Sequence, residues 1–552
     1  MLDSPVNPLR MSLGPAQRAT DQRLADWDAA GFARRLWAKD HTLWAKEPAE
    51  IANRLGWLAL PEAMQAHVPA IAAFVQEVRS AGFQHVVLLG MGGSSLAPEL
   101  FARTFGHTPG YPQLTVLDST HPGAVRAVEK SVPLERTLFI VSSKSGTTIE
   151  PNSFLNYFWA RVAEKTKTPG SHFVAITDPG TLLGKHAAAR NFRRVFEAVP
   201  DVGGRYSALT HFGLVPAALL GVDVARFLQA ASRMARACSG SVPAARNPGL
   251  VLGAALAELA RAGRDKLTFV TSPSLALLPA WLEQLIAEST GKNGKGIVPV
   301  AGEPLGAPQQ YAPDRVFVSL RAARDSDAAQ EARLMALEAA GHPVIRIEAG
   351  DTINLGQEFF RWEVAVAAAG AALGIQPFDQ PDVELAKTLA RQAMAGAAQG
   401  PAAGAPVLAS DRAALRKAVA DWLSKAQPGD YIALQAYLAS NDSTDSALAS
   451  LQRTLRDTTR LATTLGYGPR FLHSTGQLHK GGPNSGLFVQ FLDEPSEPLP
   501  VPETDYTFAQ LLQAQALGDF QALAQRGRRI LRVQLGRDAA SGIKSFEEAV
   551  RG

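Results

Sequence analysis

The chain has 552 residues, of which 46% are apolar and 19% are charged. At roughly 100–200 residues per domain, this length allows several domains and a core that folds without disulfides or structural metals. Cys238 is the only cysteine, which excludes internal disulfides and any cysteine-rich zinc or iron–sulfur site. Lys and Arg exceed Asp and Glu by only four, which does not indicate a nucleic-acid partner but suits a small anionic ligand.

The sequence contains no segment that predicts a membrane partner. The start of the chain, MLDSPVNPLRMSLG, lacks the apolar core of a signal peptide. The most apolar run, residues 364–375, is rich in Ala and Gly and is too short to span a bilayer. We therefore expect a soluble cytoplasmic protein.

Residues 1–75 have the periodicity of amphipathic helices and predict an N-terminal helical segment. Five large apolar side chains are the expected packing anchors of this segment: Trp27, Phe32, Leu36, Trp37 and Trp44.

Beyond residue 75, short apolar runs alternate with helix-length segments, a pattern typical of parallel sheets covered by helices. The first lobe is expected over residues 76–215, with strands at 85–90, 114–119, 137–143 and 172–178. The second lobe is expected over 216–552, with strands at 266–272, 315–320, 343–348, 431–438, 487–492 and 530–535. The predicted fold class is thus α/β, with two doubly wound parallel sheets. The Ala/Gly/Pro-rich stretch 393–406 is interpreted as an exposed linker within the second lobe.

GMGGSS (90–95) follows the first predicted strand directly. Its glycines would let the backbone approach a ligand at the start of the next helix. The motif is not a dinucleotide fingerprint, because Ser95 stands where the third glycine belongs. It is not a nucleophile elbow either, because Leu96 replaces the last glycine of that motif. A simple glycine-rich turn remains the alternative.

SSKSGTTIEP (142–151) follows another predicted strand and contains five hydroxyls, a lysine and a glycine within seven residues. Hydroxyls and free backbone N–H groups at a helix start form a phosphate cradle, to which Lys144 would add positive charge. The two loops would meet at the carboxyl edge of one sheet, where open α/β folds bind ligands. A solvated Ser/Thr loop remains the alternative, but the pattern favours a small phosphorylated ligand.

Four further motifs each have a functional and a structural interpretation. LEQLIAESTGKNGKG (282–296) places Gln284 and Glu288 on one helix face, and its GKNGKG part lacks the residues of a nucleotide-binding P-loop. Arg205 in VGGRYS could stabilise an oxyanion or form a salt bridge. FDQPDVELAK (378–387) contributes Gln380 and Lys387, although a single helix lysine is usually solvated. HSTGQLHKGG (473–482) spaces its histidines six apart, unlike a helical zinc pair, so no metal is expected.

Taken in order, GMGGSSLAPEL, SSKSGTTIEP, VGGRYS, LEQLIAESTGKNGKG and FDQPDVELAK resemble glucose-6-phosphate isomerases. The sequence is most similar to the isomerase half of bacterial bifunctional transaldolase/phosphoglucose isomerases, although no transaldolase barrel is recognised. The resemblance extends over residues 90–387 and implies two sugar-isomerase lobes, a homodimer, and catalysis without a metal or organic cofactor.

The resemblance also implies a role for each matching residue. Glu288 would be the catalytic base, Arg205 would stabilise the enediolate, and Lys387 would lie near the ring oxygen. The substrate-binding positions would be Gly92, Gly93, Ser94, Ser143, Lys144, Ser145, Thr148, Gln284 and Gln380. The family's ring-opening histidine is absent from the stretch that follows Glu288, and His473 is interpreted as its displaced counterpart. The alternative is that His473 only caps or packs a loop.

These roles together imply an aldose–ketose isomerase of glycolysis and gluconeogenesis. It would interconvert glucose 6-phosphate and fructose 6-phosphate by ring opening and proton transfer through a cis-enediol. Two alternatives remain, namely a non-catalytic sugar-phosphate sensor of the same fold and an isomerase of another phosphosugar.

Overall fold

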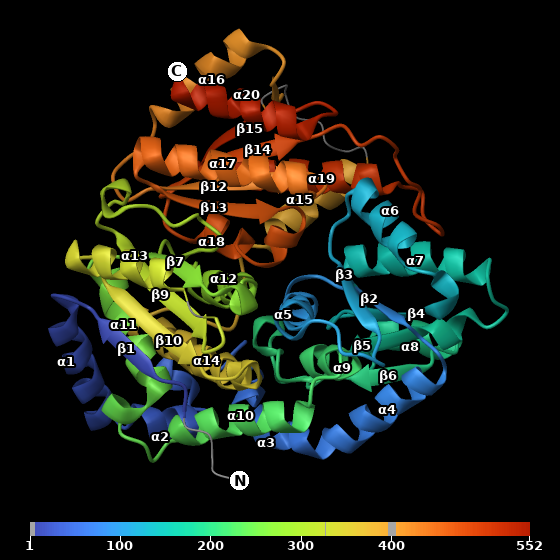
Figure 1. Cartoon of the computed structure of the whole chain (residues 1–552), viewed down its shortest axis with the longest axis horizontal. Helices are drawn as coiled ribbons and strands as arrows, with labels where there is room; N and C mark the ends of the chain where they lie inside the picture. Colours follow the sequence, from blue (N-terminus) through green and yellow to red (C-terminus); the bar gives the residue numbers. More distant parts are fainter. Residues whose placement is uncertain (1–5, 326, 396–403) are drawn as a thin grey trace.

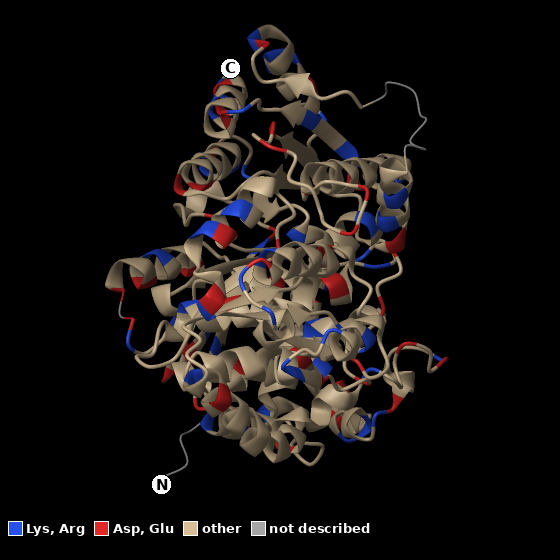
Figure 2. Ribbon diagram, turned by 90° about the vertical axis from the view of Figure 1, so that its right-hand side faces the viewer, with Lys and Arg blue, Asp and Glu red and all other residues tan. Residues whose placement is uncertain are grey.

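Three five-stranded sheets, each flanked by helices, surround a common centre in the computed structural model of the chain (Figure 1). The structure describes residues 6–325, 327–395 and 404–552. Lys and Arg are interspersed with Asp and Glu on the face shown in Figure 2, as the small net charge predicts. The predicted α/β class with parallel sheets is therefore confirmed, whereas the number of sheets is larger than expected.

The first sheet is entirely parallel, with the strand order β3-β2-β4-β5-β6. Its strands are β2 (His85–Leu89), β3 (Gln113–Leu117), β4 (Thr137–Ser142), β5 (Phe173–Thr177) and β6 (Arg194–Glu197). Its helices are α5 (Leu96–Phe105), α6 (Pro122–Ser131), α7 (Ile149–Ala163) and α8 (Leu182–Ala189). The chain leaves β2 for β3 on one side and returns to β4 on the other, so the topological switch point lies between β2 and β4. Ligands bind at such a point in open α/β sheets.

The second sheet has the order β1-β10-β9-β7-β8, with only β1 antiparallel. Its strands are β1 (Leu9–Ser12), β7 (Lys266–Thr271), β8 (Val298–Val300), β9 (Arg315–Ala322) and β10 (Val344–Ala349). The helices around it are α10 (Val224–Ala237), α11 (Pro248–Arg261), α12 (Leu278–Thr290), α13 (Ala328–Ala339) and α14 (Leu355–Leu373), whereas α9 (His211–Leu219) packs on α5 and on α4 (Val68–Ser80). The helix α14 is buried along almost its whole length and packs on α10 and α11. It therefore lies at the centre of the largest hydrophobic core.

The third sheet, with the order β11-β15-β14-β12-β13, is parallel throughout. Its strands are β11 (Val407–Leu408), β12 (Tyr431–Tyr437), β13 (Ala462–Tyr467), β14 (Gly486–Leu492) and β15 (Arg529–Gln534). The helices α16 (Arg412–Leu423), α17 (Asp442–Thr459), α18 (Gly476–Gly481), α19 (Phe508–Gln525) and α20 (Ala539–Arg551) follow its strands.

The expected single lobe over 216–552 is thus divided between two sheets. The edge strands β8 and β13 face each other without pairing, although side chains of both belong to one hydrophobic cluster. The third sheet also has a separate core of its own, formed with α16, α17 and α20. The apolar runs in the sequence identified the strands. A run of this kind does not specify which other strand it pairs with, so the division into two sheets was not predicted.

The N-terminal segment is helical, as expected, except for the edge strand β1. Its helices are α1 (Ala16–Ala29), α2 (Phe32–Trp37), α3 (Leu60–Ala63) and α4 (Val68–Ser80). Three of the predicted anchors, Trp27, Phe32 and Leu36, are buried. Trp37 and Trp44 are partly buried, and their indole N–H groups donate to the carbonyls of Cys238 and Ala367.

One helical stretch, Gly56–Ser80, is long and apolar enough to cross a membrane by composition alone. The stretch is divided into short helical turns and α4, and the α4 side chains Ile71, Phe74 and Val78 are fully buried. Of its most apolar window, 39% is buried inside the structure.

The predicted linker at 393–406 lies largely outside the described residues, which end at 395 and resume at 404. The helix α15 (Glu384–Met394) extends into its beginning and packs on α19.

Candidate active site

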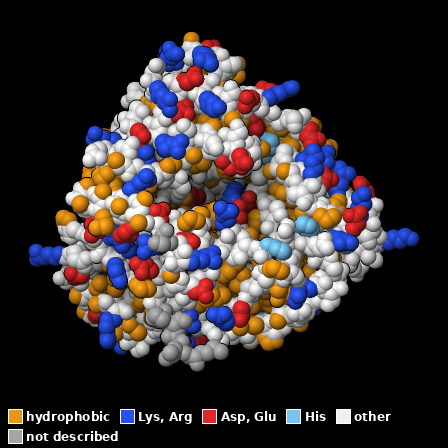
Figure 3. Space-filling view, viewed as in Figure 1, with side chains coloured by type: hydrophobic (Ala, Val, Ile, Leu, Met, Phe, Trp, Pro, Cys, Tyr) orange, Lys and Arg blue, Asp and Glu red, His pale blue; other side chains and the backbone are white. Residues whose placement is uncertain are grey.

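A cavity of about 400 Å³ lies where the three sheets meet. In the view of Figure 1, the molecular surface is hollowed near its centre (Figure 3). Segments of all three sheets line the cavity, and every residue predicted for the site is among them: Gly92, Gly93, Ser94, Ser143, Lys144, Ser145, Thr148, Arg205, Gln284, Glu288, Gln380, Lys387 and His473.

The loop after β2 forms a 3₁₀ turn, Gly92–Ser94, before α5 begins. Gly92 has φ +55°, a conformation that L side chains rarely adopt. A Cβ at Gly93 would lie 2.1 Å from the carbonyl oxygen of Gly204. Gly93 therefore lets the loop lie against the Arg205 turn, and Gly92 lets it lie against Gln284 and His473; the predicted approach of this backbone to a ligand stays a prediction.

The loop after β4 places a cluster of hydroxyls at the start of α7. Ser143 Oγ donates to Thr148 Oγ1 at 3.3 Å, and the hydroxyls of Ser145 and Thr147 lie 3.1 Å apart. Thr148 is the N-cap residue of α7, but its side chain makes no capping hydrogen bond. Its hydroxyl is thus directed to the loop, beside the positive end of a 15-residue helix. This arrangement suits the oxygens of a phosphate.

Lys144 lies in the cavity, but its ammonium is not free. The Nζ atom lies 2.6 Å and 2.7 Å from the two carboxylate oxygens of Asp178. Asp178 follows β5, the neighbour of β4 in the sheet, and is therefore close enough to pair with Lys144. This ion pair largely neutralises the positive charge that Lys144 was expected to add to the phosphate site.

Arg205 and Glu288 form an ion pair in the wall of the cavity, with Nη1 3.3 Å from Oε2. Their side chains are only 3% and 13% exposed, so little water screens the pair. Arg205 also donates from Nε to Ser289 Oγ and from Nη2 to the carbonyl oxygens of Pro377 and Asp379. The guanidinium is thereby fixed in one orientation beside the carboxylate.

The two predicted glutamines connect different walls of the cavity. Arg205 Nη1 donates to Gln380 Oε1 at 3.0 Å. Gln284, one turn before Glu288 on α12, donates from Nε2 to the carbonyl oxygen of His473 at 2.7 Å. Gln284 Oε1 is buried and has no hydrogen-bond partner in the structure, so it could accept a substrate hydroxyl.

His473 ends the 3₁₀ turn Arg470–His473 that follows β13 of the third sheet. Its Nε2 lies 3.0 Å from Oε1 of Glu150, which belongs to the first turn of α7 in the first sheet. Gln515 of α19 also donates to this oxygen, at 2.7 Å. Burial acts to raise the pKa of Glu150, but the charge and hydrogen bond of His473, together with a backbone hydrogen bond and the charge of Lys387, lower it below its usual value. Glu150 is therefore an ionised, fixed partner of the imidazole.

Lys387 of α15 lines the cavity from its open side. Its side chain is 51% exposed, and Nζ donates to Glu384 Oε1 on the same helix at 2.7 Å. The ammonium is thus held by a surface ion pair of the kind that contributes little free energy.

His211, the other histidine near the Arg205 motif, is not among the residues that line the cavity. Its Nδ1 lies 2.7 Å from the carbonyl oxygen of Glu197, and burial lowers its pKa. The geometry therefore favours His473 as the histidine of the site.

Sequence reasoning missed Glu150, Asp178 and Arg54 as parts of the site. Glu150 lies within the Ser/Thr motif itself, but its sequence position suggested only a helix start. Asp178 pairs with Lys144, and Arg54 lines the cavity from the N-terminal segment. No local pattern distinguishes Arg54 from other surface arginines.

Comparisons with known proteins agree with this geometry. Residues 60–299 match the family model described as phosphoglucose isomerase. A glucose-6-phosphate isomerase of Rubrobacter xylanophilus is 29% identical over 418 residues, which cover 64% of this chain and 95% of that protein. One of Methanocaldococcus jannaschii is 29% identical over 345 residues, covering 56% and 84%.

Two solved structures show the same fold. A hypothetical protein from Thermus thermophilus superimposes with a TM-score of 0.61 at 24% identity, covering 70% of this chain and all of that one. A glucose-6-phosphate isomerase from Chlamydia trachomatis gives a TM-score of 0.54 at 21% identity, covering 70% and 86%. Residues 60–299 thus match the phosphoglucose isomerase family model, and the chain is similar in sequence to glucose-6-phosphate isomerases of other organisms.

Proposed function

We propose that this protein interconverts glucose 6-phosphate and fructose 6-phosphate at the cavity between the three sheets. One observation carries the proposal: Glu288, Arg205 and His473 line a single cavity together with the hydroxyl-rich loops, and the cavity residue His473 is paired with Glu150. A carboxylate base, an oxyanion stabiliser and an imidazole are the groups that sugar isomerisation requires.

The phosphate would bind at the hydroxyls of Ser143, Ser145 and Thr148, at the start of α7, with the glycine turn 92–94 on the other side. This anchor would hold the flexible sugar in place, with its reacting carbons near Glu288. The proton transfer would then have the advantage of an intramolecular reaction. Because Lys144 is already paired with Asp178, it would hold the loop in position rather than neutralise the charge of the phosphate.

Ring opening is the first chemical step, because the substrate is mainly a cyclic hemiacetal. His473 would exchange a proton with the ring oxygen or the anomeric hydroxyl, and Glu150 would hold the imidazole in place. Lys387 would assist at the same oxygen from the open side of the cavity.

Proton transfer between C2 and C1 is the second step, and we assign it to Glu288. Its carboxylate would remove the C2 proton, giving a cis-enediolate, and return the proton to C1. Arg205 bears a fixed positive charge beside this carboxylate and would stabilise the negative oxygen of the intermediate. Gln284 and Gln380 would orient the sugar hydroxyls.

The direct test is to incubate the purified protein with glucose 6-phosphate and to follow fructose 6-phosphate by NMR. We expect conversion to equilibrium, in parallel with inhibition by inorganic phosphate. Binding of glucose 6-phosphate without any conversion would instead support a sensor. Faster turnover of mannose 6-phosphate or an amino sugar phosphate would reassign the substrate.

The same proposal includes a cytoplasmic homodimer active in glycolysis and gluconeogenesis. The motif set supports a relationship to the isomerase half of the bifunctional transaldolase/phosphoglucose isomerases. Gel filtration with light scattering would measure the oligomeric state.

A further inference from the structure

The motif GKNGKG (291–296) follows the helix of Glu288 and forms a tight turn in the structure. Lys292 and Lys295 pair across it, with reciprocal backbone hydrogen bonds of 3.1 Å and 2.9 Å. The central residues Asn293 and Gly294 both have positive φ, at +55° and +71°. Asn-Gly is the sequence that such turns favour. The turn thus places Lys292 and Lys295 side by side just after the end of α12, but the environments of their side chains differ.

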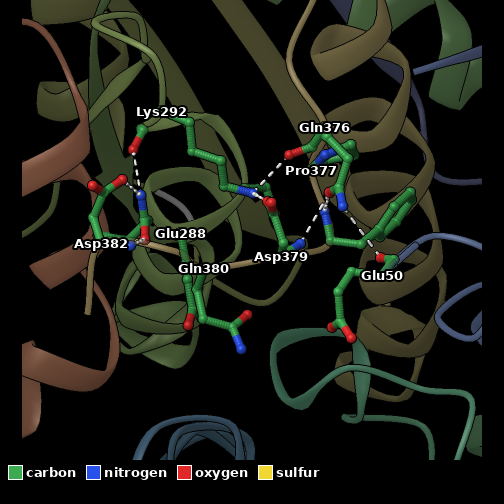
Figure 4. Close-up of polar contacts among 12 residues, drawn as sticks. Glu50, Glu288, Lys292, Gln376, Pro377, Asp379, Gln380 and Asp382 are labelled. Carbon is green, nitrogen blue, oxygen red and sulfur yellow. Dashed lines mark hydrogen bonds and ion pairs between the residues drawn. The ribbon is translucent and has the colours of Figure 1, made fainter. Parts of the chain in front are cut away.

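Lys292 is buried and points away from solvent into the loop that joins α14 to α15. Its side chain is 3% exposed, and Nζ donates to the carbonyl oxygen of Gln376 and to Asp379 Oδ1, both at 2.7 Å (Figure 4). Lys295, by contrast, donates from Nζ to the carbonyl oxygen of Leu373 at the end of α14.

The loop that Lys292 holds, residues 376–382, also provides the partners of Arg205. The Arg205 guanidinium binds the carbonyl oxygens of Pro377 and Asp379 and the side chain of Gln380. The loop is braced further by Gln376, whose Oε1 accepts from the backbone N–H groups of Phe378 and Asp379. Lys292 and Arg205 therefore hold the same loop from two sides.

We infer that Lys292 is a positioning residue of the isomerase, which clamps the 376–382 loop and so fixes Arg205 and Gln380 relative to Glu288. This inference rests on the proposed function. The clamp acts through Asp379 and the Gln376 carbonyl, without contact between Lys292 and the sugar. Lys292 is also four residues after Glu288, so its charge adds to that of Arg205 near the base.

The titration of Lys292 agrees with this arrangement. Burial lowers its pKa to about 7, the neighbouring Arg205 acts in the same direction, and Asp379 opposes both. The charged groups that face it are Arg205 of the 3₁₀ turn, Glu288 of α12 and Asp379 of the loop. A buried amine is retained in its charged form only through such partners.

The test compares Lys292→Met, Lys292→Arg and the matched control Lys295→Met in the full chain. In Lys292→Met, we expect kcat to fall about 10- to 100-fold, since small displacements of catalytic groups have effects of this size. We expect KM to change by less than about threefold, because the phosphate loops do not contact Lys292. The acidic limb of the kcat profile should move to higher pH, because a positive charge beside a carboxylate favours its ionised form.

Lys292→Arg should restore the acidic limb, and Lys295→Met should retain the parental kcat. Hydrogen exchange measured over residues 376–382 gives a readout that is independent of catalysis, and it should increase in Lys292→Met alone. Parental exchange in that variant, an unmoved acidic limb, or an equal loss in Lys295→Met would overturn the inference. If the parent does not convert glucose 6-phosphate, the proposed function fails, while the exchange measurement still decides whether Lys292 clamps the loop.

Discussion

The two walls of the cavity differ in how far apart their residues lie in the sequence. The hydroxyl wall, residues 92–94 and 143–148, comes from two loops of one sheet, each directly after its strand. The histidine wall is formed by His473, and its partner Glu150 is 323 positions away and belongs to a different sheet. We therefore expect ligand binding to depend on local loop chemistry, and the action of His473 to depend on how the third sheet packs against the first.

The largest effect is expected at Glu288, which the cavity places between the two walls. Glu288→Gln keeps the shape of the side chain but removes the proton acceptor, so kcat should fall by about 10³- to 10⁴-fold. Binding of glucose 6-phosphate, measured by calorimetry, should persist because the hydroxyl wall is intact. Retained turnover would show that another residue is the base.

The next effect tests the histidine wall. His473→Ala should lower turnover of cyclic glucose 6-phosphate by about 10²-fold, since general acid–base assistance is lost. Isomerisation of an open-chain analogue should be nearly unaffected, because Glu288 remains. The exposed His107→Ala serves as the control. Equal losses with both substrates, together with a lower melting temperature, would indicate that His473 only packs its loop.

A third expectation concerns Glu283, the neighbour of Gln284 on α12. Burial raises its pKa from 4.5 to about 7, although Ser474 donates to it and Arg470 lies near. The folded state therefore favours protonated Glu283, whereas the unfolded chain releases this proton at a lower pH. As pH rises from 4.5 to 7, the free energy of unfolding should decrease by up to about 3 kcal/mol from this group.

Denaturant unfolding of the parent and of Glu283→Gln over this pH range measures that contribution. The variant should lack this component of the pH dependence, whereas Glu62→Gln, at an exposed position, should retain it. Parallel profiles for the parent and Glu283→Gln would contradict the assignment.

The smallest effect is expected in the hydroxyl wall. Thr148→Val should weaken sugar-phosphate binding by about 1–3 kcal/mol, the cost of leaving a charged-group hydrogen bond unmade. Thr166→Val, beyond the far end of α7, is the matched control. Competition by inorganic phosphate should weaken in parallel; unchanged affinity for both ligands would place the phosphate elsewhere.

The contrast between local and long-range features also explains how much of the fold the sequence could predict. All ten predicted strands are present, because continuous apolar runs form the buried strands of parallel sheets. The five further strands in the described part of the chain lack that signal. β8 (VPV) and β11 (VL) are very short, β1 and β6 are four-residue edge strands, and β13 (ATTLGY) is partly polar. The division of the second series into two sheets depends on long-range pairing that no local run encodes.

For the site, too, the sequence predicted the residues that belong to local motifs but not the partners that long-range packing brings to them. The predicted residues all line the cavity, since each belongs to a motif with its own chemical character. The partners that complete them, Glu150 for His473 and Asp178 for Lys144, were not identified because the pairing arises only when separate strands and sheets come together. Lys292 was likewise not identified, because its partners Gln376 and Asp379 lie 84 and 87 positions away in the sequence.

Proton exchange in deuterated water tests the central claim, that Glu288 moves a carbon-bound proton in the cavity between the three sheets. The parent protein is incubated with glucose 6-phosphate, and NMR follows both fructose 6-phosphate and deuterium at C2. We predict that fructose 6-phosphate forms and that deuterium accumulates at C2 over repeated turnovers, with both signals lost in Glu288→Gln. Undiminished fructose 6-phosphate formation, or undiminished labelling, in Glu288→Gln would contradict the account.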